Sequence, residues 1–181
     1  MQVREKALQT LTEPVTASEF KTYIGYSGSD QDSLLATMIK SARLFLESEC
    51  GFSCISKVYQ AEFEKSDAVD GWYKLPFYPV TLITSVEIGD TAVGYEEKGL
   101  KVKEIKPDVL FQTIPILGTG LNILQVEFTA GESSDLAKMA IYRIVADLFN
   151  YKEDFVSGVN IAYLSFDTMR LVNSLNTNTS I

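Results

Sequence analysis

Residues 135–151 read DLAKMAIYRIVADLFNY, and this stretch decides how the rest of the chain must be arranged. It predicts a helix over 135–151 with apolar side chains on nearly every side. Such a helix is buried on most of its surface. Its cover can come from the core of the same chain or from a neighbouring subunit, and the sequence leaves both interpretations open. The candidate residues for a subunit contact on this helix are Met139, Tyr142, Leu148 and Phe149.

Upstream of this helix, the first signal of regular structure follows Pro14. Thr16 with Glu19 three residues later fits a capping box, which predicts a short helix over 16–24 that stops near Gly25. The polar residues 1–12 before it are interpreted as a flexible leader.

A second helix is predicted over 31–50, where apolar residues recur every three or four positions. Gly51 is placed to end it. Asp30 and Asp32 are interpreted as caps of this helix, because no calcium-loop spacing follows them. The charged residues that fall largely off the apolar stripe are Lys40, Arg43, Glu47 and Glu49.

Residues 55–130 change character, since ISKVYQAEFE (55–64) alternates apolar and polar side chains as a half-buried strand does. The sequence therefore predicts an α+β fold: a small bundle of three to four helices with an antiparallel β region, 55–130, inserted between the second and third main helices. Within it, an apolar loop over 109–124 could cover a neighbour or pack as strands in its own chain. Its candidate contact residues are Phe111, Ile116 and Leu117.

The chain is thus divided into a leader, a main domain over 13–163, and a C-terminal helix and tail over 164–181. The final helix is indicated by the apolar positions of YLSFDTMRLVNSL, and the last residues are polar. No apolar stretch reaches the length of a membrane span, and no membrane partner is expected.

The amino-acid composition disfavours several classes of function. The net charge is −8, from 16 basic and 24 acidic residues, and the basic residues are scattered singly, which disfavours tight binding to DNA. There is no histidine, so Ser-His-Asp and Cys-His catalysis cannot be built from this chain alone. Together with the lack of a phosphate-binding loop, this predicts a protein that is not an enzyme and has no cofactor.

Two cysteines, Cys50 and Cys54, lie in the sequence CGFSC. They are interpreted as small buried thiols at the end of a helix, with a redox pair as the other interpretation. Two cysteines without histidine do not supply a structural zinc site, so no metal is expected.

Read in order, five segments resemble the head–tail connector, or adaptor, proteins of long-tailed bacteriophages. EPVTASEFKTYI (13–24) is similar to their opening, and DQDSLLATMIKSARLFLESECGFS (30–53) to their second helix. LPFYPVTLITSVEI (75–88) and LQVEFTAGE (124–132) resemble their strands, and DLAKMAIYRIVADLFNYKED (135–154) their apolar helix. The C-terminal LSFDTMRLVNSL departs from the Leu-Pro and Pro-Tyr-Arg pattern of that family.

The resemblance implies a structural protein of the virion neck, present in the host cytoplasm during assembly. Such proteins form a ring, dodecameric in the particle, which lies beneath the portal, extends the DNA channel without binding DNA specifically, and docks a stopper or tail-completion protein. The residues then expected to dock on the portal are Phe166, Met169, Arg170, Leu171 and Leu175. Alternatives are another neck or tail-completion protein, and a monomeric module that binds carbohydrate or peptide through its aromatic residues.

Overall fold

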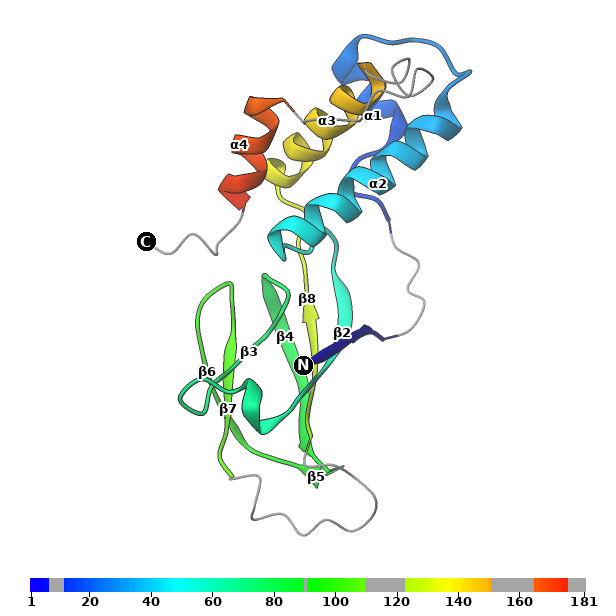
Figure 1. Cartoon of the computed structure of the whole chain (residues 1–181). Helices are drawn as coiled ribbons and strands as arrows, with labels where there is room; N and C mark the ends of the chain where they lie inside the picture. The colour runs from blue at the N-terminus through cyan, green and yellow to red at the C-terminus, as the bar shows by residue number, and fades with distance from the viewer. Residues whose placement is uncertain (7–11, 90, 110–122, 151–164, 176–181) are drawn as a thin grey trace. The chain divides into compact units, whose positions relative to one another are not determined.

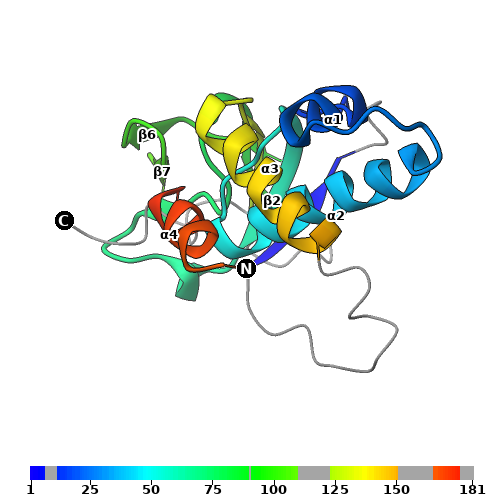
Figure 2. The same cartoon turned by 90° about the horizontal axis from the view of Figure 1, so that it is seen from above.

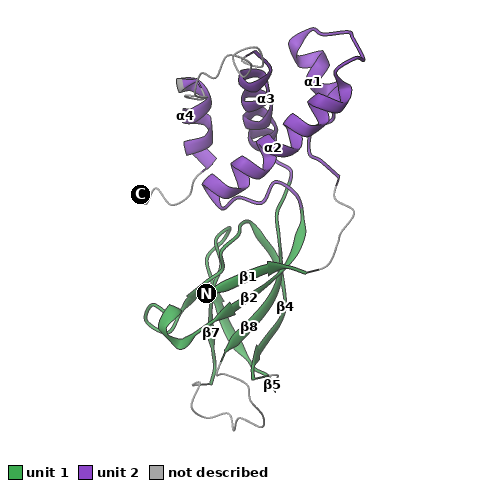
Figure 3. Cartoon of the chain, turned by 45° about the vertical axis from the view of Figure 1, so that its right-hand side comes forward, with its two compact units in different colours: residues 1–10, 56–132 green, residues 11–55, 133–181 purple. Residues whose placement is uncertain are grey.

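The computed structural model describes residues 1–6, 12–89, 91–109, 123–150 and 165–175. The chain divides into two compact units, which Figure 3 shows in different colours. The β unit comprises residues 1–10 and 56–132, and the helical unit comprises residues 11–55 and 133–181. The predicted α+β class is confirmed, and the predicted main domain over 13–163, with its β insertion over 55–130, spans parts of both units.

In its described residues, the β unit contains eight strands and one short 3-10 helix, η1 (Figure 1). Five strands form one antiparallel sheet in the order β1-β2-β8-β4-β5, and three form a second in the order β3-β7-β6. In chain order the elements are β1 (Gln2–Glu5), β2 (Lys57–Phe63), η1 (Lys65–Asp67), β3 (Tyr73–Lys74), β4 (Val80–Ile88), β5 (Thr91–Ala92), β6 (Tyr95–Lys98), β7 (Glu104–Pro107) and β8 (Leu124–Ala130).

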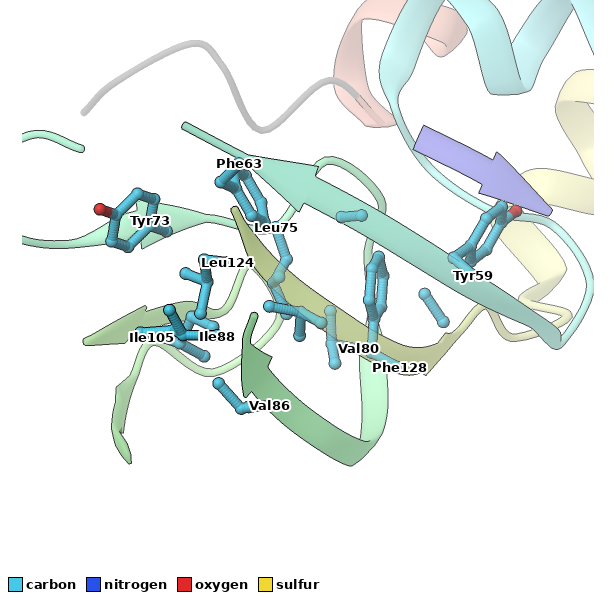
Figure 4. Close-up of a cluster of buried hydrophobic side chains, with 13 residues drawn as sticks. Tyr59, Phe63, Tyr73, Leu75, Val80, Val86, Ile88, Ile105, Leu124 and Phe128 are labelled. Carbon is cyan, nitrogen blue, oxygen red and sulfur yellow. The ribbon is translucent and has the colours of Figure 1, made fainter. Parts of the chain in front are cut away.

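The core of the β unit lies where the inner faces of the two sheets meet. Strands β2 and β8 bury every second residue, as the alternating sequence predicts. Their register places Tyr59 opposite Phe128, and the two rings stack with centroids 5.6 Å apart. Figure 4 shows Ile88, Ile105 and Leu124, which come from both sheets, gathered in this core.

Strand β1 is the main departure from the predicted domain layout. Residues 2–5, expected to belong to a flexible leader, pair antiparallel with β2, with Gln2 opposite Glu62. The pairing uses main-chain groups and polar cross-strand contacts, such as Arg4 Nη2 donating to Gln60 Oε1 at 3.0 Å. A strand of this kind has little apolar alternation, so the sequence pattern does not reveal it.

The helical unit contains α1 (Ala17–Ile24), α2 (Asp32–Cys50), α3 (Asp135–Asn150) and α4 (Phe166–Leu175). Helix α3 lies between α1 and α4 and also packs against α2 (Figure 2). The first helix begins with the predicted capping box, in which Glu19 N donates to Thr16 Oγ1 and Thr16 N donates to Glu19. Gly25 and Gly51, both at positive φ, end α1 and α2 as predicted.

The residues before α2 differ from the prediction. Gln31 occupies the N-cap position and makes no side-chain cap hydrogen bond. Asp32 instead forms an ion pair with Lys21 of α1 at 2.7 Å, and Asp30 accepts a hydrogen bond from the hydroxyl of Tyr26. These contacts of the two carboxylates fasten the loop between α1 and α2.

Arg43, expected on the outer side of α2, is buried and only 2% exposed. Its Nε donates to Glu13 at 2.7 Å and its Nη1 donates to Glu47 at 2.8 Å. The other carboxylate oxygen of Glu47 accepts from the backbone N–H of Cys54 at 3.1 Å. Burial acts to lower the pKa of Arg43, but the hydrogen bonds that Arg43 donates to Glu13 and Glu47 and the charges of these two carboxylates outweigh it and raise the pKa.

Candidate assembly surfaces

The apolar residues of α3 divide into a buried and an exposed set. Its buried side consists of Ala137, Ala140, Ile141, Ile144 and Val145. Leu136 and Met139 are about two-fifths exposed, at 42% and 39%. The core of the same chain therefore covers most of α3, and the exposed residues are the ones left for a subunit contact.

Two of the candidate contact residues on α3 have partners within the helical unit. Tyr142 stacks on Tyr23 of α1, with ring centroids 4.9 Å apart and an interplanar angle of 11°. Phe149 packs edge-on against Phe20 at 6.4 Å and against Tyr26 at 6.1 Å. Like Leu148, both are half-buried, so they contribute first to holding α1 on α3. Met139 is the candidate that stays exposed.

Helix α4 is fastened at its first turn by a carboxylate from α3. Asp147 Oδ2 accepts from the backbone N–H of Ser165 at 3.0 Å and from Thr168 Oγ1 at 2.9 Å. Val172 and Leu175 are buried further along, and α4 packs against both α2 and α3. Contacts within the same chain therefore hold α4 in place, and no portal protein is needed for this.

The candidate portal-docking residues are distributed unevenly around α4. Met169 and Arg170 are exposed and Leu171 is half-buried. Leu175 is 7% exposed and belongs to the core of the helical unit, so its side chain is not available for docking. The side chain of Phe166 lies outside the described part of the structure, as do Phe111, Ile116 and Leu117.

Helix α2 presents an apolar surface that the sequence analysis did not single out. Leu34, Leu44 and Phe45 are 43%, 48% and 37% exposed, and Met38 is half-buried beside them. The regular apolar spacing of α2 identifies only the stripe that faces the core. The signal for this second surface is the small number of exposed charges on the same helix, where Lys40 is the only one between Ser33 and Ser48.

The two cysteines are free and buried, as the first of their two interpretations predicts. Cys50 Sγ lies 3.3 Å from the backbone oxygen of Val172, and burial raises the pKa of this thiol to about 11. Within the described ranges, no group of three or more Cys, Asp or Glu side chains is placed to hold a metal ion. In the same ranges, no helix is long and apolar enough to cross a bilayer.

Residues 13–164 match the head completion protein family. The chain belongs to this family. The predicted membership of a phage head–tail connector family is confirmed by this match.

Solved structures of similar fold come from phage-like particles. A chain in the neck of an empty gene transfer agent particle, computed with C6 symmetry, is 20% identical with a TM-score of 0.71. A chain in the virion of a native gene transfer agent particle is 20% identical with a TM-score of 0.72. A third, from the native neck computed with C12 symmetry, is 17% identical with a TM-score of 0.67. Each match covers 100% of this chain and 98% of the other.

These matches show that chains of low sequence identity in gene transfer agent particles share this fold over its whole length. No curated protein matches the chain.

Proposed function

We propose that this head completion protein is a structural component of the neck of a phage-like particle. Copies of it form a closed ring beneath the portal, extend the DNA channel and dock a stopper or tail-completion protein. The observation that carries the proposal is the full-length similarity of fold to chains in gene transfer agent necks, together with membership of the family. The solved necks were computed with C6 and C12 symmetry, which agrees with a ring.

The charge of the chain supports a passive role toward DNA. A net charge of −8 gives a surface that does not attract phosphates, so DNA can pass along a ring of such subunits without being retained. Assembly takes place in the host cytoplasm, and the finished ring is part of the virion.

We place the portal contact on the outer side of α4. Met169 and Arg170 are exposed there, while Thr168, Val172 and Leu175 hold the helix on the bundle. An exposed Met next to an Arg offers an adaptable apolar contact and a charged donor.

A reconstitution with the cognate portal tests the proposal. Purified protein is mixed with portal rings, and electron microscopy is expected to show an added ring of density beneath the portal. Absence of that density at saturating protein would overturn the neck function. Density elsewhere on the particle would indicate another neck or tail-completion protein.

Surface variants of α4 test the portal contact without disturbing the fold. Met169→Asp combined with Arg170→Glu is expected to abolish portal binding, whereas Asn173→Asp on the exposed side of the same helix serves as the matched control. Circular dichroism should show that all these proteins are folded. Portal binding that survives the double substitution would remove α4 from the contact.

A further inference from the structure

The helical unit carries two unlike exposed apolar surfaces, and we propose that they form the ring contact. The α2 face consists of Leu34, Met38, Leu44 and Phe45. The α3 face consists of Leu136, Met139 and Arg143, with Tyr23 of α1 beside them. We infer that the α2 face of one copy docks on the α3 face of the next copy. This inference rests on the proposed function, because it specifies how the ring closes.

The α2 face is nearly free of charge. Between Ser33 and Ser48 the only exposed charged residue is Lys40. The other exposed positions are large apolar, alanine or hydroxyl residues, namely Ser33, Leu34, Ala36, Thr37, Ser41, Leu44, Phe45 and Ser48. This surface extends roughly 20 Å along the helix at 1.5 Å per residue. Solvated helix faces ordinarily carry charged residues, so a face of this length with one charge and three large exposed apolar side chains indicates a contact with protein.

The α3 face is shorter and more aromatic. Leu136, Met139 and Arg143 follow one another at three- and four-residue spacing, so they form one row along the helix. Tyr23, 41% exposed, adjoins the row through its stacking on Tyr142, which lies three residues from Met139. Tyr, Met and Arg are the residue types enriched in the centres of protein interfaces.

The two faces are different and both lie outside the contact between their helices. Helices α2 and α3 pack together, with their buried rows turned toward the core of the helical unit. Their exposed rows are therefore left uncovered by this packing. A closed ring of identical subunits needs a head-to-tail contact between two different surfaces, and two unlike faces of the same unit can supply it.

The charges on the α2 face and the α3 face are also compatible with binding of a second copy of this chain. The α2 face has Lys40 within it and Glu49 at its end, and the α3 face has Asp135 at its start and Arg143 within it. None of these four residues forms an ion pair with another described residue. Each face is therefore close to neutral, and two copies can approach through them although the whole chain carries −8.

Disulfide trapping tests this contact even when association is weak. One chain carries Phe45→Cys and a second carries Met139→Cys, and the two are mixed in a redox buffer. Both positions are exposed, so the fold should survive, as circular dichroism will check. The native Cys50 and Cys54 are buried, and the raised pKa of Cys50 keeps its thiol protonated. A mixture of Leu100→Cys and Met139→Cys is the control, because Leu100 is exposed on the β unit.

A covalent heterodimer should form on the order of tenfold or more faster in the test mixture than in the control, because docking raises the effective concentration of the two thiols. Each single variant alone should give little dimer. A heterodimer rate equal to that of the control would overturn the proposal. So would homodimers of Phe45→Cys that form as fast as the heterodimer, since they would indicate a symmetric contact between two α2 faces.

A chain that carries both Phe45→Cys and Met139→Cys separates this inference from the proposed function. If both hold, oxidation gives a ladder of covalent oligomers that ends in a closed ring, visible by electron microscopy. An open ladder without closure would support the contact of the two faces and contradict the neck ring.

Discussion

The β unit and the helical unit differ in the residues that they expose. In the β unit, outward residues pair with one another, as Lys98 does with Glu104 at 2.9 Å and Lys103 with Glu97 at 2.7 Å. Its exposed apolar residues include Val69, Leu100 and Val109, in or beside turns, and Leu82 in β4. In the helical unit, Leu34, Leu44 and Phe45 share α2 and Leu136 and Met139 share α3, while Tyr23 and Met169 lie on α1 and α4.

This difference indicates which unit is complete by itself. Two sheets enclose the core of the β unit, so its surface gains little from a further partner. The described helices enclose a core of their own but leave exposed apolar residues on the outer sides of α2 and α3. Contacts between subunits are therefore expected on the helical unit, where they cover surface that the chain cannot cover alone.

The largest effect is expected from the core of the β unit. Phe128→Ala removes a fully buried ring and should lower the free energy of unfolding by about 3–5 kcal/mol. The only tryptophan, Trp72, lies in this unit, so its fluorescence reports the transition. Leu82→Ala, at an exposed position of β4, is the control and should change stability by less than about 0.5 kcal/mol. Equal losses from both substitutions would contradict the described core.

A smaller effect is expected from the ion pairs of the helical unit. Arg43→Ala leaves Glu47 buried without its cation and should cost about 3 kcal/mol. Lys40→Ala, on the exposed side of the same helix, should cost almost nothing. Circular dichroism at a wavelength that reports helix follows the unfolding of the helical unit. The fluorescence of Trp72 follows the unfolding of the β unit.

The same variant sharpens the comparison of the two units. Arg43→Ala should lower the urea midpoint measured by circular dichroism more than the urea midpoint measured by tryptophan fluorescence. If both signals shift together for Arg43→Ala and for Phe128→Ala, the two units unfold as one cooperative body.

Loss of the cap on α1 should have a moderate effect. Thr16→Ala removes the acceptor for Glu19 N and should destabilise the helical unit by about 1 kcal/mol. Thr22→Ala changes the same residue type within the exposed side of α1 and serves as control. A cost at Thr22 as large as that at Thr16 would show that capping is not the cause.

The smallest effect on stability is expected from acidification. The hydrogen bond from the backbone N–H of Thr16 lowers the pKa of Glu19 below its ordinary value of 4.5. The carboxylate therefore contributes stability that is present above pH 4.5 and is lost as the pH falls through the lower, folded-state pKa. Comparing the urea midpoints of the wild type and Glu19→Gln between neutral and acid pH measures this. A difference that does not shrink on acidification would contradict it.

Local signals predicted the helices and the central strands well. Thr16 and Glu19 mark the start of α1, and Gly25 and Gly51 mark the ends of α1 and α2, because capping depends only on neighbours in sequence. The alternation of apolar and polar residues predicted β2 in the same way, because this strand buries one face.

Features that depend on distant partners were not predictable from local pattern. Arg43 is buried because Glu13, thirty residues away, neutralises it together with Glu47. β1 exists because the open edge of β2 accepts it. The aromatic partners of Tyr142 and Phe149 come from α1 and its following loop, so a helix that reads as apolar all round is covered largely within its own chain.

The position of β1 indicates how the β unit can be made as a separate protein. Its last pairing places the backbone N–H of Lys6 2.9 Å from the carbonyl oxygen of Val58, so residues 6 and 58 face each other as the two ends of a tight hairpin turn do. In topological terms, α1 and α2 lie in the loop of a β-hairpin. Replacing residues 7–57 by Asn-Gly should therefore join β1 to β2 in the same register. A miniature protein that ends at residue 132 would then carry the complete β architecture on one continuous stretch of backbone.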